Sequence, residues 1–366
     1  MDLYQQRLGN LQRLLSELSC DALLIEDNIN LFYLTGLDLS AGRLLAHGHG
    51  AELIVDSRYY EVCKQTSPFP VHLAGTNGAV ASLLSSPPFD WVETLGFAIE
   101  NTTYERFLQL KGEVDSMNKG GKRGHSLTLM PVENPAAALR RIKDAAEIQT
   151  LREAAQLGSR GFDYVCSLLQ EGMAESEIAL ELEIYWKREG GKSLAFDPII
   201  AFGANSSMPH YRAGDRQLQM GDTVQIDIGV NHKHYHSDMS RVVFFGDPDP
   251  KMLAIYDIVL SAQEAALNLC RPGTLIGDLD DSARSVIVSE GYGENFTHSL
   301  GHGLGLEVHE PPIIRNRPPY RNLPLEAGMV LTIEPGIYLP GVGGVRLEDT
   351  VVITEEGCEN LTKRPK

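Results

Sequence analysis

Acidic residues stand inside four apolar segments in the second half of the chain, where the composition is otherwise that of β-strands. They are Asp227 in TVQIDIGV, Asp238 in HYHSDMSRVVFF, Glu334 in MVLTIEPGIYL and Glu348 in GGVRLEDTVVI. A buried carboxylate is costly unless a positive charge or a set of hydrogen bonds compensates it. Any fold of this chain must therefore supply partners for these four acids.

The first two of these segments flank the turn NHKH and together predict a β-hairpin. If the turn is centred between His232 and Lys233, antiparallel pairing sets Asp227 directly opposite Asp238 on one face of the hairpin. Like charges in that position destabilise a hairpin. A positive group is therefore expected between the two aspartates.

A glycine-rich segment, HSLGHGLGLEVHE, carries His298, His302 and His309. Each glycine costs a helix interior about 1 kcal/mol relative to alanine, so this segment is not expected to be helical. The zinc motif HExxH is excluded, because Ser299 stands where that motif needs its glutamate. The glycines are expected to let the backbone around His302 pass close to bound metal ions.

One histidine and four carboxylates make a ligand set dominated by hard oxygen atoms. Each acid taken alone is more simply explained as a structural carboxylate with satisfied hydrogen bonds. Together with His302, the four acids suit divalent ions, with some ligands bridging two ions as in dinuclear hydrolases. The sequence therefore predicts two divalent metal ions, Mn²⁺ before Co²⁺ or Zn²⁺.

The first part of the chain has the pattern of a separate α/β domain. Leucines at helical spacing predict an amphipathic helix over residues 2–19, and ALLIE, RLLAHG and AELIVD predict short strands. Two prolines in LMPVENPAAALRR interrupt the pattern, so we predict domains of residues 1–131 and 132–366. One long helix is predicted over residues 139–169.

The composition and charge limit the classes of binding partner and the cellular compartment that are expected for this protein. With 32 basic and 49 acidic residues the formal net charge is −17, which disfavours nucleic acids and anionic membranes as partners. The first residues lack the pattern of a signal peptide, and no apolar run has the length of a membrane span. The five cysteines are scattered without a CxxC pair, so we expect neither disulfides nor a thiolate metal site, and a cytoplasmic protein.

Five motifs resemble, in order, those of the pita-bread metallopeptidases, and especially the aminopeptidase P and prolidase branch. These motifs are IDIG, SDMSR, GHGLGLEVHE, TIEPGIY and GVRLED. More loosely, NINLFYLTG and LIVDSRYY are similar to parts of the creatinase-type N-terminal domain. The resemblance implies a creatinase-type α/β domain with a mixed sheet, followed by an α+β pita-bread catalytic domain, in a homodimer.

The resemblance also implies the ligands of two metal ions. Asp238 and Glu348 would bridge the two ions, and Asp227 would chelate one of them. His302 and Glu334 would complete the coordination of the other. A hydroxide bridging the ions would then attack the carbonyl group that precedes proline.

Further roles follow from the same resemblance. Glu334 would carry the proton from the attacking water to the departing proline nitrogen. His309 and His210, the latter in SSMPHYRAGD, would hydrogen-bond the substrate and stabilise the tetrahedral intermediate. His298 would line the proline side of the site, and Arg346 would steady the bridging glutamate.

Two activities share this framework, and both use peptides with proline in the second position. A dipeptidase needs a cation for the carboxylate of proline, whereas an aminopeptidase leaves that side open. Ile313 stands where short microbial prolidases have an arginine, although Arg315, Arg317 and Arg321 follow it. The sequence therefore favours an Xaa-Pro aminopeptidase, with an Xaa-Pro dipeptidase (prolidase) as the alternative.

A function of another class is a catalytically silent pita-bread binding module. Such modules lose metal ligands, whereas this chain keeps all five matching residues. A creatinase-like hydrolysis without metals is disfavoured for the same reason.

Overall fold

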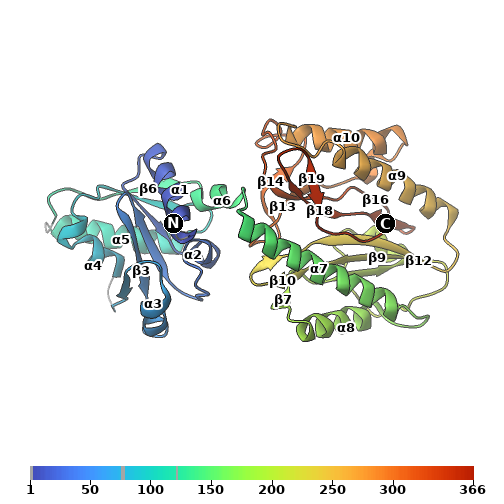
Figure 1. Ribbon diagram of the computed structural model, residues 1–366, viewed down its shortest axis with the longest axis horizontal. Coiled ribbons are helices and arrows are strands. Elements are labelled where there is room, and N and C mark those ends of the chain that lie inside the picture. Colours follow the sequence, from blue (N-terminus) through green and yellow to red (C-terminus); the bar gives the residue numbers. More distant parts are fainter. Residues whose placement is uncertain (1–2, 76–78, 121–122) are drawn as a thin grey trace. The chain divides into compact units, whose positions relative to one another are not determined.

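The computed structural model describes residues 3–75, 79–120 and 123–366, which form two compact units (Figure 1). Unit 1 comprises residues 1–140 and unit 2 residues 141–366. The sequence-based boundary at 131/132 falls inside strand β6 (Thr128–Val132), which belongs to the sheet of unit 1. The observed division therefore comes later in the chain.

Unit 1 is built on a six-stranded mixed sheet with the strand order β4-β3-β2-β1-β5-β6. Strand β1 pairs antiparallel with β2 and parallel with β5, which confirms the expected mixed α/β domain. The other strands and the helices are β1 (Ala22–Ile25), β2 (Arg43–His47), β3 (Gly50–Val55), β4 (Val71–Leu73), β5 (Thr94–Ala98), α1 (Leu3–Glu17), α2 (Asn28–Thr35), α3 (Tyr60–Thr66), α4 (Ala79–Leu84), α5 (Tyr104–Gly120) and α6 (Pro135–Arg140).

Helix α1 is amphipathic, as its leucine spacing predicts. Leu8, Leu11 and Leu15 are buried together with Arg7, whereas Arg13 and Glu17 on the other side of the helix are exposed. Burial of each leucine side chain stabilises the folded state by roughly 1.5–3 kcal/mol relative to leaving it exposed. The helix is thus held to unit 1 by one stripe of side chains.

The prediction of one helix over residues 139–169 is wrong, because α6 ends at Arg140 and a new helix, α7 (Ala145–Leu168), begins after Asp144. The Asp144 carboxylate accepts hydrogen bonds from the backbone N–H groups of Ala146 and Glu147. The Glu147 carboxylate in turn accepts one from the Asp144 N–H. This capping box defines a helix start, and a hydrophobic period that continues across it hides the break.

Unit 2 packs two pairs of helices against short sheets. Helices α9 (Pro250–Leu267) and α10 (Ile276–Ser289) lie on one side of the strands, and α7 and α8 (Glu175–Arg188) on the other (Figure 1). Each pair covers its own core cluster of buried apolar side chains. The expected α+β architecture is confirmed.

The strands of unit 2 form four sheets, ordered β11-β10-β7, β12-β9-β8, β14-β13-β15-β18-β19 and β16-β17. The strands are β7 (Ser193–Leu194), β8 (Ile199–Phe202), β9 (Asp222–Ile228), β10 (Val230–His232), β11 (Tyr235–His236), β12 (Met239–Phe245), β13 (Gly301–Gly303), β14 (Glu310–Ile314), β15 (Val330–Ile333), β16 (Gly336–Leu339), β17 (Gly343–Arg346), β18 (Asp349–Ile353) and β19 (Cys358–Asn360).

The predicted register of the hairpin is wrong by one position in the turn. The turn is centred between Lys233 and His234, which adopt positive φ angles of 49° and 74°. Asp227 therefore pairs with Ser240 rather than with Asp238. Because side chains alternate with a period of two along a strand, this slip keeps Asp238 on the same face, as a diagonal neighbour of Asp227.

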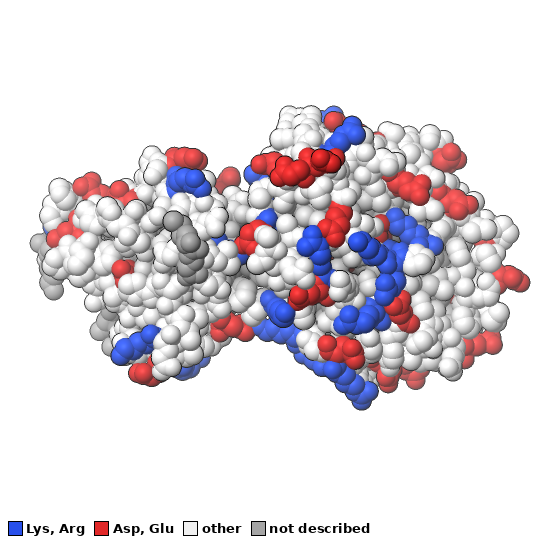
Figure 2. Space-filling view, viewed as in Figure 1, with Lys and Arg blue, Asp and Glu red and all other residues white. Residues whose placement is uncertain are grey.

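Basic side chains gather over unit 2 on the face shown in Figure 2. Two of the arginines in a shallow basic pocket of this unit are neutralised by acids, Arg152 by Glu359 at 2.7 Å and Arg364 by Asp163 at 2.7 Å. Across the three described ranges, no helix combines the length and the apolar composition of a membrane-spanning segment.

Candidate metal centre and substrate pocket

One pocket of unit 2, with a volume of about 340 Å³, collects the side chains that the sequence analysis singled out. Its wall contains Asp227, Asp238, His302, Glu334 and Glu348, together with His210, His298, His309 and Arg346. These residues come from strands β9, β13 and β17 and from the loops beside the strands. The fold thus brings all the expected site residues to one cavity.

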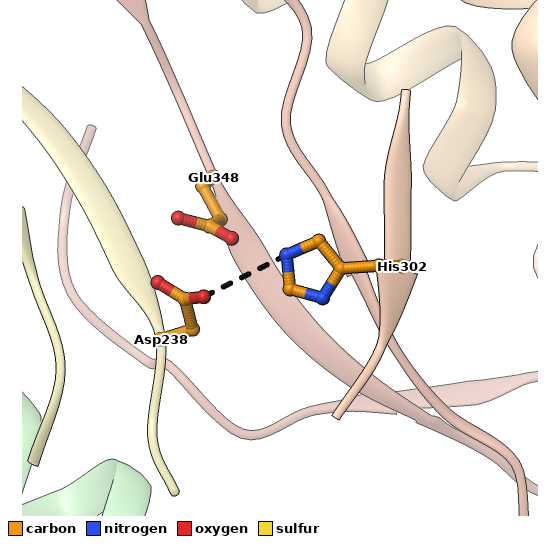
Figure 3. Close-up of side chains that lie close together, drawn as sticks. All are labelled: Asp238, His302 and Glu348. Atoms are coloured by element: carbon orange, nitrogen blue, oxygen red, sulfur yellow. Dashed lines mark ion pairs between the residues drawn. The ribbon is translucent and has the colours of Figure 1, made fainter. Parts of the chain in front are cut away.

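The close-up in Figure 3 shows how three of these side chains face one another. Asp238, His302 and Glu348 are buried, and each offers a ligand atom within 4.8 Å of those of the other two. The Nε2 atom of His302 lies 3.8 Å from Oδ2 of Asp238. This spacing leaves room for a cation among the three groups.

The charges of this cluster call for such a cation. Burial and the neighbouring carboxylate of Asp227 raise the pKa of Asp238 well above its ordinary value, and burial and Asp238 do the same to Glu348. Among the described side chains, Oδ1 of Asp227 and Oε1 of Glu348 are buried without a hydrogen-bond partner. Buried oxygens without partners, set among like charges, fit divalent ions with a preference for oxygen ligands.

Glu334 joins the cluster through His302. Its Oε1 atom lies 3.3 Å from Nε2 of His302. Burial opposes the charge on both groups, but their mutual hydrogen bond and attraction raise the pKa of His302 to about 9 and lower that of Glu334 to about 2. Without metal, a proton on Nε2 therefore supplies the positive charge that these acids require.

The orientation of His302 is set by its backbone surroundings. Its Nδ1 atom lies 3.1 Å from the carbonyl oxygen of Gly303, so an Nδ1–H donates there and leaves Nε2 for the carboxylates. Its backbone N–H donates to the hydroxyl of Thr332 at 3.0 Å, and that hydroxyl donates to Glu334 at 3.2 Å. Thr332 therefore positions two of the candidate ligands.

Glycine is required beside His302 because the strands approach very closely. A Cβ atom on Gly301 would lie 2.0 Å from the carbonyl oxygen of Thr332, and one on Gly303 would lie 2.6 Å from that of Pro311. No other residue fits at these distances. The close approach in the structure is therefore to strands β14 and β15, and the expected approach to metal ions stays a prediction.

Asp227 stands apart from the group of three, because it is paired with Arg346. The buried guanidinium of Arg346 contacts the Asp227 carboxylate and also donates to the hydroxyl of Tyr338 at 2.8 Å and to Ser240 at 3.1 Å. Arg346 thus neutralises Asp227, and its charge also acts on Glu348, because it opposes the rise in pKa that burial causes there.

Besides His302, three histidines line the pocket, namely His210, His298 and His309. The ring of His309 lies 4.4 Å from that of His302, between centroids. The Nε2 atom of His298 lies 2.9 Å from the hydroxyl of Tyr338. Burial lowers the pKa of both His298 and His309, which favours neutral imidazoles that can donate hydrogen bonds to a substrate.

Sequence reasoning missed several residues that hold the site together. Tyr338 lies within the quoted motif TIEPGIY, but it was assigned no role. Gln263 of α9 is fully buried, and its side-chain amide donates to the carbonyl oxygens of Ile333 at 2.9 Å and Leu347 at 3.1 Å. A polar residue in the apolar face of α9 was the only signal in the sequence.

Comparisons with known proteins agree with this geometry. Residues 149–355 match the model of metallopeptidase family M24, and residues 7–142 match the creatinase/prolidase N-terminal domain. An Xaa-Pro dipeptidase of Pyrococcus horikoshii is 36% identical over 365 residues, which cover 99% of this chain and 98% of that protein.

Solved structures extend the likeness to the whole fold. The structure of an Xaa-Pro dipeptidase from Bacillus anthracis matches with a TM-score of 0.91 and 33% identity, over 99% of this chain and 98% of that one. An X-Pro aminopeptidase from Thermotoga maritima matches with a TM-score of 0.85 and 34% identity, over 96% and 97% of the two chains. Both units are included in these matches.

Proposed function

Because the chain belongs to metallopeptidase family M24 and begins with a creatinase/prolidase N-terminal domain, we propose that this metallopeptidase is an Xaa-Pro dipeptidase that uses two divalent ions, with Mn²⁺ as the first candidate. The observation that carries the proposal is the buried cluster of Asp238, His302 and Glu348 inside a pocket of about 340 Å³. A pocket of this volume suits a small substrate.

The preference for a dipeptidase replaces the expectation of an aminopeptidase. That expectation rested on Ile313 alone, in the place of an arginine. Full-length relatives from Pyrococcus horikoshii and Pyrococcus furiosus, 36% and 37% identical, are Xaa-Pro dipeptidases and support the dipeptidase. The Thermotoga maritima structure keeps the Xaa-Pro aminopeptidase as a second candidate function.

The five candidate ligands divide by their surroundings. Asp238 and Glu348, whose carboxylates face each other and His302, are suited to be shared by two ions. Glu334 would bind beside His302, and Asp227 would contribute while Arg346 balances its charge. Bound divalent ions would supply positive charge that polarises the scissile carbonyl group and makes a water molecule more acidic.

The chain's own residues would handle the proton and the substrate. Glu334, buried beside His302, would accept a proton from the attacking water and deliver it to the proline nitrogen. His309 and His210 would donate hydrogen bonds to the carbonyl oxygen as negative charge develops there. His298, held by Tyr338, would line the side of the pocket that receives proline, and Arg346 would keep the Asp227 carboxylate in place.

A substrate with proline in the second position explains why this site would bind and activate the peptide by charged groups rather than by pairing with its backbone as a β-strand does. An Xaa-Pro bond has no N–H group, and the proline ring locks φ near −65°. A site that recognised substrates through backbone hydrogen bonds would bind such a peptide poorly. The apolar part of the wall, formed by Phe196, Ile199, Val308 and Ile313, suits the proline ring.

The test compares hydrolysis of Xaa-Pro with that of Xaa-Pro-Yaa by the purified, Mn²⁺-loaded protein. Cleavage confined to the dipeptide is expected, and a chelator or Glu334→Gln should reduce kcat at least about 100-fold, as loss of a general base does. Release of the first residue from the tripeptide would make the protein an aminopeptidase. If the protein hydrolysed neither peptide and bound no metal, it would be a binding module of the same fold.

The proposal includes a homodimer and a cytoplasmic location. All five cysteines are free thiols, which supports a reducing compartment.

A further inference from the structure

The pocket is rich in negative charge but must hold an anion if the substrate is a dipeptide. Its wall contains five carboxylates, those of Asp197, Asp227, Asp238, Glu334 and Glu348. Bound divalent ions would offset the four ligand carboxylates, but the proline carboxylate of a dipeptide would still need a hydrogen-bonding partner of its own. A cation with free donor groups is therefore needed on the side that receives proline.

Two arginines line the pocket among the described residues, and only one of them is available. Arg346 is buried, with 4% of its side chain exposed, and is engaged by Asp227, Tyr338 and Ser240. The side chain of Arg212 is 79% exposed and contacts that of Asp197, which is 69% exposed. An arginine presents five N–H donors, so this single contact leaves Arg212 able to bind a carboxylate.

The arginines that the sequence offered for this role do not line the pocket. Arg321 is held outside it by the Asn316 carbonyl oxygen at 2.7 Å and by Asp281 at 3.2 Å. Arg315 and Arg317 are also absent from the wall, whereas the apolar Ile313 belongs to it. The cation of this pocket thus comes from a different segment than the sequence suggested.

The loop that carries Arg212 is anchored in the core of unit 2. The hydroxyl of Tyr211 donates to the fully buried carboxylate of Glu175 at 2.7 Å and accepts a hydrogen bond from Asn205 at 2.8 Å. His210 precedes this anchor and Arg212 follows it, and both line the pocket. The anchor therefore fixes the backbone between Arg212 and a histidine proposed to bind the scissile carbonyl.

We propose that Arg212 is the specificity residue that binds the free carboxylate of the second residue of the substrate, with Asp197 holding its guanidinium at the pocket in the absence of substrate. This inference rests on the proposed dipeptidase function. Arg212 would then distinguish a dipeptide from a longer peptide. In short microbial prolidases an arginine stands at the position that Ile313 occupies in this chain.

The experiment compares Arg212→Gln and Arg212→Lys with the unaltered protein, all loaded with Mn²⁺, on an Xaa-Pro dipeptide and on its C-terminal amide. Arg212→Gln should raise KM for the dipeptide about 10- to 100-fold, the effect of losing a charge-assisted hydrogen-bonded pair, with kcat nearly unchanged. It should leave kcat/KM for the amide unchanged, and lysine should restore part of the loss. Arg321→Gln, a substitution outside the pocket, is the matched control.

The outcomes separate this inference from the function beneath it. If the unaltered protein cleaves the dipeptide but Arg212→Gln changes dipeptide and amide equally, or changes neither, then Arg212 forms only a surface ion pair and the inference is overturned alone. If the unaltered protein cleaves no dipeptide, or prefers the tripeptide, the proposed function fails and the inference with it. Circular dichroism and metal content of each variant exclude misfolding as the cause.

Discussion

At the scale of single residues, the site brings buried carboxylates so close together that their ionisation is unfavourable without a positive charge between them. Asp238 and Glu348 are carboxylates whose burial and proximity raise their pKa values, while His302 holds a proton up to about pH 9 because of Glu334. All three shifts mean that the folded, metal-free protein binds more protons than the unfolded chain. Each group therefore destabilises the metal-free fold as the pH rises.

This sign yields a prediction for thermal stability. The melting temperature of the chelator-treated protein should fall as pH rises, because ionisation of the buried Asp238 and Glu348 costs the folded state free energy. Between pH 6.5 and about pH 9 the stability contributed by protonated His302 is lost as well. Glu334, whose pKa of about 2 is lowered, loses its contribution only under strongly acid conditions. Mn²⁺ should raise the melting temperature at pH 8 by about 5 °C or more.

The control for this prediction is Asp238→Asn, which removes one like charge and one ligand. It should flatten the pH dependence of the metal-free protein and abolish the stabilisation by Mn²⁺. Identical pH profiles with and without Mn²⁺ would contradict the charge assignment.

The cysteines supply a second prediction at this scale, which the sequence did not suggest. A hydrogen bond from Cys270 lowers the pKa of the Cys358 thiol to about 7, whereas burial raises that of Cys166 to about 11. Both side chains are partly exposed. At pH 7.5, iodoacetamide should modify Cys358 at least about 10-fold faster than Cys166, because the thiolate is the reactive form.

Peptide mapping by mass spectrometry measures these rates. In Cys270→Ser the thiol donor is replaced by a weaker-fitting hydroxyl, so labelling of Cys358 should slow. Equal labelling of Cys358 and Cys166 in the unaltered protein would refute the assigned thiol pair.

At the scale of elements, the site depends on links between segments that are distant in the sequence. Glu334 follows β15 directly, and Glu348 lies between β17 and β18. Helix α9 ties the backbone before both acids together through Gln263. The side chain of Gln225 on β9 adds a similar link, accepting a hydrogen bond from the Arg346 N–H at 2.7 Å.

Replacing Gln263 by leucine tests this arrangement. Two buried carbonyl oxygens would lose their donor, so we expect the free energy of unfolding to fall by about 2–4 kcal/mol. We also expect weaker Mn²⁺ binding, since Ile333 and Leu347 directly precede Glu334 and Glu348. Urea denaturation and calorimetric titration measure the two effects.

Gln149→Leu on α7 is the matched control. The Gln149 side chain is exposed and donates to Glu153 at 3.2 Å, so its loss should change stability by no more than about 0.5 kcal/mol. A similar small effect for Gln263→Leu would show that the helix does not hold the two acids.

At the scale of the whole molecule, the candidate site lies in unit 2, whereas unit 1 carries an exposed apolar pocket. Every candidate ligand and pocket residue belongs to unit 2. Unit 1 carries an apolar pocket of about 610 Å³ beside the edge strand β6, with Tyr104 75% and Ile99 50% exposed. Exposed apolar surface of this kind marks interaction sites, which suits a role of unit 1 in the proposed homodimer.

Light scattering on the purified protein should therefore give twice the mass of one chain. Tyr104→Glu would place a charge in the apolar pocket and should shift the dimer toward monomers at low micromolar concentration. Val62→Glu is the control, because Val62 is 53% exposed on α3, outside this pocket. A monomeric unaltered protein, or a Tyr104→Glu dimer of full stability, would argue against this surface.

Much of the fold could be predicted from the sequence, because its signals are local. The leucine stripe of α1 and the strand segments of unit 1 were visible in the residue pattern, and the order of the five motifs around Asp227 to Glu348 identified the metallopeptidase family. The break between α6 and α7 was not visible in the sequence. The capping box at Asp144 starts a new helix there, but the hydrophobic period continues across it.

What the sequence by itself determined is the kind of chemistry: one imidazole and four carboxylates in glycine-rich strands, suited to hard divalent ions. The tertiary structure alone decided the pairing of Asp227 with Ser240 and with Arg346, the ion pair of His302 with Glu334, and the exposure of Arg212. The physical reason is that the residue type at each position, and with it the available functional groups, can be read directly from the sequence. Charge balance, pKa values and access depend instead on distances between segments that only the folded chain brings together.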